Sequence, residues 1–147
     1  MAAVARSDAP ADDGPAMKII EPVCAVFRRT LKAEGLKYTP ERARILDEAV
    51  RFSEPFRAEA LLDRLRAGGG QRISKATVYR TIRLLQQAGI LQQVLLDADQ
   101  THYLLAWGHG DDGLLVRTDT HSVERLDLPE LAALRDRLCR QRGLEAQ

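Results

Sequence analysis

The amino-acid sequence predicts an α+β fold, in which helices and a β-hairpin are followed by a second hairpin and a last helix. Apolar residues recur at helical spacing in four segments between residues 17 and 88. Two short apolar segments joined by the turn residues 97–100 come directly afterwards and predict a hairpin. Helix, helix, turn, helix and hairpin is the element order of a winged helix-turn-helix domain, which we expect over residues 17–107.

Composition and charge are compatible with a nucleic-acid partner. The 147 residues suit one medium domain or two small ones, and 45% of them are hydrophobic. The net charge is only +1, yet residues 28–107 hold 14 Lys and Arg against 9 Asp and Glu. This basic segment favours DNA as a partner, although a need for solubility would also explain it.

Cysteines and targeting signals add little. Cys24 and Cys139 lie far apart in apolar helical contexts, so we expect two buried residues and no disulfide. The sequence has no apolar run that would span a bilayer and no apolar secretion signal. These features predict a cytoplasmic protein without a membrane partner.

Local signals place the first elements in order. Residues 1–16 are rich in Ala, Asp and Pro and predict a disordered tail. A helix is expected over 17–34, with Pro22 in its first turn, and a second helix begins after Thr39, a good N-cap. A third helix is expected over 57–67, and the glycines 68–70 then predict a flexible turn.

The segment 74–88 has the pattern of a DNA recognition helix. Ser74 is a good N-cap, and Gly89 ends the helix before two strands at 91–96 and 101–106. One face is apolar and is formed by Val78, Ile82, Leu84 and Leu85. The other face carries donors suited to phosphates and base edges, namely Lys75, Thr77, Tyr79, Arg80 and Arg83. We therefore expect this helix, together with Ser74, to contact DNA.

Residues 108–147 predict a truncated α/β dimerisation domain. Two strands are expected over 113–118 and 122–126, followed by a helix that Asp127 caps and Gly143 ends. So small a unit buries too little surface to fold alone, which favours a homodimer. The apolar residues expected at its interface are Leu114, Val116, Val123, Leu131, Leu134 and Leu138. A two-fold dimer would meet a palindromic operator in double-stranded DNA, with half-sites about 34–36 Å apart or a multiple of that.

Two segments carry a resemblance to a known family. YTPERARILDEAV and SKATVYRTIRLLQQAGIL, with the hairpin and helix that follow, resemble the ferric uptake regulator family over about residues 28–143. The resemblance implies a homodimeric transcriptional regulator whose DNA-binding geometry is set by a metal between two domains. We expect this regulator to repress transcription, and activation is the alternative. The resemblance also implies that Tyr79 and Arg80 face the groove, with Thr77 near the backbone. Lys32 would point toward the minor groove, and Arg42 would contact the backbone.

The metal ligands of that family are largely replaced in this chain. A His-rich run ending in CxxC corresponds to residues 109–119, where His109 and Asp112 remain but Val116 and Asp119 stand at the cysteine positions. A further histidine position falls near Pro55 and Phe56, and a ligand glutamate position falls on Leu104. Asp112 and Glu124 alone still resemble one ligand set. Because the side chains of Val, Leu and Gly cannot coordinate, we expect no metal, no cofactor and a metal-independent regulator, either constitutively competent for DNA or controlled by another signal. If the loss of ligands locks an open dimer instead, the chain would bind DNA poorly.

Three other interpretations were weighed against this one. A regulator with a non-standard metal site would draw on His102, His109 and His121, together with nearby carboxylates. A winged helix that binds a protein partner and no DNA would have the same element order. An enzyme is not expected, because the sequence has no nucleophile with an adjacent base, and its glycine run lacks the GKS/T ending of a phosphate loop.

Overall fold

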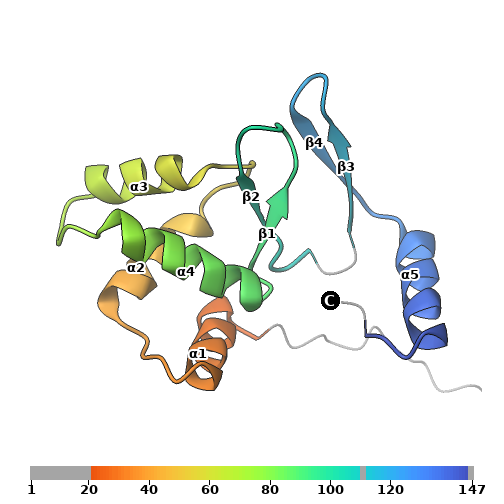
Figure 1. Ribbon diagram of the computed structural model, residues 1–147, viewed down its shortest axis with the longest axis horizontal. Helices are drawn as coiled ribbons and strands as arrows, with labels where there is room; N and C mark the ends of the chain where they lie inside the picture. The colour runs from red at the N-terminus through yellow and green to blue at the C-terminus, as the bar shows by residue number, and fades with distance from the viewer. Residues whose placement is uncertain (1–20, 110–111, 146–147) are drawn as a thin grey trace, which may run out of the picture.

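The computed structural model describes residues 21–109 and 112–145, which form five helices and two β-hairpins. Helices α1 (Val23–Ala33), α2 (Pro40–Ala49), α3 (Ala58–Ala67) and α4 (Lys75–Gln87) pack together. Strands β1 (Leu91–Val94) and β2 (His102–Leu105) form the wing. Strands β3 (Gly113–Arg117) and β4 (Ser122–Leu126) and helix α5 (Pro129–Gln141) follow at the far end (Figure 1). The order confirms the predicted winged-helix arrangement, and the predicted tail lies outside the described residues.

Side-chain caps define the start of two helices, as predicted. The Thr39 hydroxyl accepts the backbone N–H of Arg42 at 3.3 Å, and Ser74 Oγ accepts that of Thr77 at 3.1 Å. The predicted cap at Asp127 is wrong. Pro129 takes the first helical position of α5, so the cap position falls on Leu128, which makes no side-chain capping bond.

The main core lies between the four helices and the wing. The predicted apolar face of α4 is buried, and Thr81 is buried with it. Phe56 and Tyr103 add a short β-bridge that was not predicted, with N–H···O distances of 2.9 and 2.7 Å in the two directions. Through this bridge the segment before α3 becomes a third, minimal strand beside the wing.

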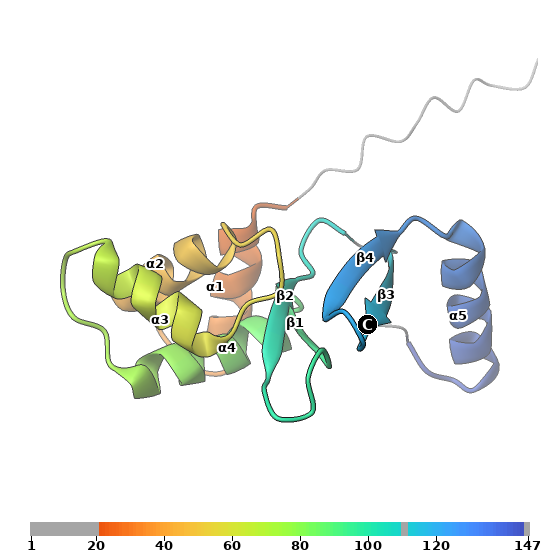
Figure 2. The same ribbon diagram turned by 90° about the horizontal axis from the view of Figure 1, so that it is seen from above.

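A second, smaller apolar cluster joins the wing to the second hairpin. Val94, Leu96 and Leu104 of the wing region are buried there. Leu114, Val116 and Val123 of β3 and β4, which the sequence predicts at a dimer interface, pack against this cluster within one chain. Figure 2 shows the two hairpins lying next to each other, between the helices and α5. The wing therefore supplies an apolar surface for the β3–β4 hairpin.

Helix α5 is exposed along its length, and none of its residues is buried. Leu131, Leu134 and Leu138 expose 50%, 41% and 43% of their surface. No helix in the described part of the chain is long and apolar enough to cross a membrane. The expectation of two buried cysteines is wrong, because Cys24 is exposed on the outer face of α1 and Cys139 is half-buried on α5.

Candidate nucleic-acid interface

The turn before α4 is held by a single arginine. The glycine run predicts a flexible turn, but the Arg44 guanidinium on α2 donates to the carbonyl oxygens of Leu65, Gly69 and Gln71 at 3.2, 2.6 and 2.8 Å. Gly69 and Gly70 have φ of +70° and +85°, which side chains rarely adopt. Arg44 thereby ties the turn to α2 and sets the start of α4.

A polar recess lies at the N-terminal end of α4. Three arginines from three segments line it, namely Arg42, Arg72 and Arg80. The recess has a volume of about 370 Å³, and its wall also includes Thr39, Glu41, Ile73, Ser74, Thr77 and Thr81. Backbone N–H groups and the helix dipole make such an end attractive to anions, so the recess suits a phosphate group.

Four of the eight predicted DNA-binding residues meet at this recess, namely Arg42, Ser74, Thr77 and Arg80. Arg42 also donates to the carbonyl oxygen of Lys37 at 2.5 Å, which holds its guanidinium on the loop before α2. Arg72 was missed in the sequence. Arg72 stands two residues before Ser74, which caps α4. That position could have identified it, because a cation there lies close to the first turn of α4.

Tyr79 lies at a different recess, on the side of α4 that faces the wing. Its hydroxyl donates to Glu59 Oε1 on α3 at 2.7 Å. This hydrogen bond lowers the pKa of Glu59 and raises the pKa of Tyr79 above their usual values. Lys75 Nζ lies 5.6 Å from the centre of the Tyr79 ring. Glu59 was also missed, because nothing local in the sequence pairs α3 with α4.

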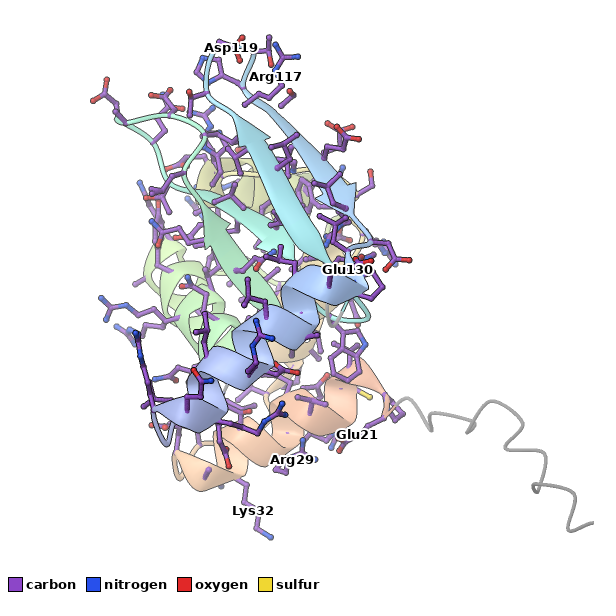
Figure 3. The ribbon with its side chains drawn as sticks, turned by 90° about the vertical axis from the view of Figure 1, so that its right-hand side faces the viewer. Glu21, Arg29, Lys32, Arg117, Asp119 and Glu130 are labelled. Atoms are coloured by element: carbon purple, nitrogen blue, oxygen red, sulfur yellow. The ribbon has the colours of Figure 1, made fainter. Side chains whose placement is uncertain are left out.

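The remaining two predicted residues lie apart from both recesses. Arg83 is exposed on α4, one turn beyond Tyr79. Lys32 is exposed in the last turn of α1, and Figure 3 shows it projecting from the end of that helix. The eight residues therefore form one cluster at the start of α4, a pair around the Tyr79 ring and two outlying cations.

The tip of the wing is acidic. Asp97 and Asp99 lie in the turn, where Asp97 Oδ1 accepts the backbone N–H of Asp99 at 3.1 Å. Arg57 at the start of α3 donates to Gln100 Oε1 at 2.8 Å and anchors the same turn. Carboxylates repel phosphates, so the electrostatics favour docking by α4 and α2 over docking by the wing tip.

The residues at the family's metal positions do not fit a metal ion. Leu104 and Phe56 are buried in the two apolar clusters, and Asp119 forms an ion pair with Arg117 at 3.1 Å. Figure 3 shows Arg117 and Asp119 together at the tip of the second hairpin. Within residues 21–109 and 112–145, no three His, Cys, Asp or Glu side chains gather in a group that could hold a metal. Tight metal sites require about four such donors.

Each candidate histidine has a partner of its own. His102 Nδ1 lies 3.2 Å from the Gln100 carbonyl oxygen, and His109 Nδ1 lies 3.4 Å from Asp112 Oδ2. His121 Nδ1 lies 2.9 Å from the Leu96 carbonyl oxygen. The structure thus does not bring the three together.

Two side chains of the second hairpin bind the backbone of the wing region. A carbonyl oxygen only accepts, so His121 Nδ1 donates to Leu96, and the Arg125 guanidinium donates to the Leu105 carbonyl oxygen. Both side chains border a cavity of about 330 Å³ that Leu104 and Glu54 also line. With the apolar cluster around Val94, Leu96 and Leu104, these two bonds fix how the hairpin sits on the wing.

Comparisons with known proteins show the family of this chain. The sequence profile of the ferric uptake regulator family matches residues 33–147. The ferric uptake regulation protein of Neisseria gonorrhoeae is 32% identical over 113 residues, which cover 77% of this chain and 78% of that protein.

Two solved structures have a similar fold. The ferric uptake regulator of Pseudomonas aeruginosa with manganese superposes with a TM-score of 0.65 at 27% identity, covering 82% of this chain and 90% of that chain. The Helicobacter pylori regulator, described as having three functional metal-binding sites, gives 0.63 at 16% identity over 89% of this chain and 88% of its own. At 16% identity the second likeness concerns the fold alone. On its sequence profile and on its 32% identity to a relative of which it covers 78%, the chain belongs to the ferric uptake regulator family.

Proposed function

We propose that this chain is a sequence-specific DNA-binding transcriptional repressor that acts as a homodimer. The observation that carries the proposal is the recess at the N-terminal end of α4, which Arg42, Arg72 and Arg80 line. Phosphate contacts at a helix end fix the register of a recognition helix, while the exposed Tyr79 and Arg80 side chains reach base edges. The ferric uptake regulator family, to which the chain belongs, consists of DNA-binding transcriptional regulators.

The proposal of a dimer rests on the exposure of the apolar face of α5. A 13-residue helix is marginal in water without a packed face, and α5 buries none of its residues. Its leucines at 131, 134 and 138 form one exposed apolar row, to which Leu128 adds a fourth member with 40% exposure. A second copy of the same row would cover it, and a two-fold arrangement would present two copies of α4 to a palindromic operator.

We further propose that DNA binding by this chain is independent of metal. Manganese in the Pseudomonas aeruginosa regulator and the three functional metal-binding sites of the Helicobacter pylori regulator are properties of those two proteins. Here the donor positions hold Leu104, Phe56 and Val116, whose side chains have no lone pair to offer. The bonds from His121 and Arg125 to the wing region supply a contact that does not require an ion.

The test is selection of genomic DNA fragments by chelator-stripped protein, repeated with zinc, iron(II) and manganese. A palindromic motif recovered equally under all conditions is the expected result. A motif recovered only with metal would keep the regulator and overturn metal independence. The absence of any motif would overturn DNA binding and favour the protein-interaction interpretation.

Arg125→Ala extends this test, because it removes the guanidinium that binds Leu105. If that contact replaces a metal, the variant should bind the selected motif more weakly, and added metal should not restore affinity. Arg117→Ala is the control, since Arg117 pairs with Asp119 at the exposed hairpin tip. Equal affinities of the Arg125 variant and the wild type would contradict the role of this contact.

A further inference from the structure

We propose that Glu59 is a positioning residue for base recognition, which binds the hydroxyl hydrogen of Tyr79, so that this side chain cannot donate to a base and presents its ring to an apolar base edge. The inference rests on the proposed DNA-binding function. It adds a residue outside the recognition helix that determines what the helix can read.

The geometry of the pair is direct. Tyr79 projects from α4 with 37% of its surface exposed, and its hydroxyl donates to Glu59 Oε1 at 2.7 Å. Glu59 lies in the first turn of α3, next to Ala58, whose burial fixes the start of that helix in the core. Both ends of the hydrogen bond therefore stand on packed helices, so the ring direction is set before any DNA is present.

The surroundings keep Glu59 ionised at neutral pH. Its hydrogen bond from Tyr79 is the largest cause of its lowered pKa, and the nearby charges of Lys75 and Arg57 act in the same direction. An ionised carboxylate only accepts hydrogen bonds, so it cannot exchange roles with the tyrosine. Charge-assisted hydrogen bonds of this kind are about twice as strong as neutral ones, which favours the observed pairing.

The consequence for recognition follows from counting hydrogens. A tyrosine has a single O–H hydrogen, and here it is held by Glu59. Guanine N7 and O6, adenine N7 and thymine O4 only accept hydrogen bonds, so a tyrosine whose hydrogen is held by Glu59 cannot bond to them. Adenine N6 and cytosine N4 donate, but the hydroxyl oxygen that would accept from them is turned toward Glu59 on α3. The exposed part of the ring remains available, and the apolar group that the major groove offers to it is the C5-methyl of thymine.

The negative charge of Glu59 is also expected to weaken DNA binding. A carboxylate beside a recognition helix repels phosphates and lowers affinity for any sequence. Glu59→Gln keeps an oxygen that accepts from Tyr79 but removes the charge, whereas Glu59→Ala removes both. The two variants therefore separate positioning from electrostatic repulsion.

The experiment replaces each thymine of the selected motif by deoxyuridine, which removes only the methyl group. We expect the wild type to lose about four-fold in affinity at one position of each half-site, the value for burial of one methyl-sized group. Glu59→Gln should retain this loss at the same position and bind all sequences somewhat more tightly. Glu59→Ala should lose the discrimination between thymine and deoxyuridine there.

Two controls complete the design. Asp63→Ala removes a carboxylate from the same helix, where Asp63 lies 3.8 Å from Arg66, and should leave the methyl discrimination unchanged. In a Tyr79→Phe background there is no hydroxyl for Glu59 to hold, so adding Glu59→Ala should produce no further change in discrimination.

A four-fold methyl effect that persists in Glu59→Ala would overturn the proposal while leaving DNA binding intact. Methyl discrimination that Glu59→Gln loses as completely as Glu59→Ala would also overturn it, because an uncharged acceptor would then fail to position Tyr79. A wild type that selects no motif at all would instead overturn the DNA-binding function on which the proposal rests.

Discussion

Helices α4 and α5 have the same length, 13 residues each, and both carry an apolar row along one face. In α4 the row is buried, with Val78, Ile82 and Leu85 in contact with the main core. In α5 the corresponding leucines are exposed, and no residue of the helix is buried. The same local pattern thus has two outcomes, because the first helices of the chain cover α4, whereas the described part of the chain covers α5 only in part, with Leu131 beside Gly113 of β3.

The difference between the two helices separates the folding of one chain from the assembly of two. The row on α4 contributes to the folding of the monomer, whereas the row on α5 contributes only if a second copy buries it. Stability and assembly should therefore respond to different mutations.

The largest effect is expected from truncating the buried row. Leu85→Ala should reduce the free energy of unfolding by about 2–5 kcal/mol, because it removes buried methyl groups and leaves a cavity. Leu134→Ala on the exposed face of α5 should change the free energy of unfolding of the monomeric chain by less than about 0.5 kcal/mol. Denaturant titration of both variants measures this contrast. Equal losses in the free energy of unfolding would contradict the difference between the buried and the exposed row.

The second effect concerns assembly. Charges placed in the exposed row by Leu131→Asp with Leu134→Asp should yield monomers on light scattering, since neither carboxylate could be buried at an interface. Specific DNA affinity should then fall on the order of 100-fold, because the second half-site contact is no longer linked to the first. An undisturbed dimer would refute the placement of the interface on α5.

A smaller effect is expected on the salt dependence of DNA affinity, which should differ between a charge removed at the start of α4 and one removed on α5. Arg72→Ala removes a guanidinium from the recess at the start of α4, so the slope of log affinity against log salt should become shallower by about 0.9. Arg137→Ala is the matched control, because it makes the same charge change on the exposed side of α5. Equal slopes for the two variants would show that the recess does not contact phosphate.

The smallest effect is a pH dependence confined to the α4 side. The Tyr79 bond lowers the pKa of Glu59, so its contribution to stability is present above the unfolded value of 4.5 and is lost as pH falls through the folded value. The same bond raises the pKa of Tyr79, so that contribution is present below pH 10.0 and is lost as pH rises through the folded value. Tyr79→Phe should flatten the stability profile at both ends, which thermal unfolding across pH measures.

The features that sequence reasoning predicted correctly are local. Thr39 and Ser74 each cap a backbone group three residues away, and the buried face of α4 repeats at helical spacing. The sequence placed Val116 at a dimer interface, and within one chain it packs on the wing. A local apolar pattern does not indicate the partner, because an apolar side chain packs equally well on the wing or on a second chain.

The features that were missed join distant parts of the chain. Arg44 reaches Gly69 across 25 residues, and Tyr79 reaches Glu59 across 20. The bridge between Phe56 and Tyr103 is longer still. Polar contacts of this kind depend on where helices and strands finally lie, so a pattern read along one segment does not contain them.

The three hydrogen bonds of Arg44 have a consequence for how fast the protein finds its site. A loop that becomes ordered only on contact would lose about 1–2 kcal/mol of backbone entropy per residue during binding. Here the turn before α4 is already ordered by the folded chain. The encounter with DNA then needs no local rearrangement, and the association rate is set by diffusion, orientation and electrostatic attraction. Removing Arg44 would shift part of that ordering into the encounter and slow association.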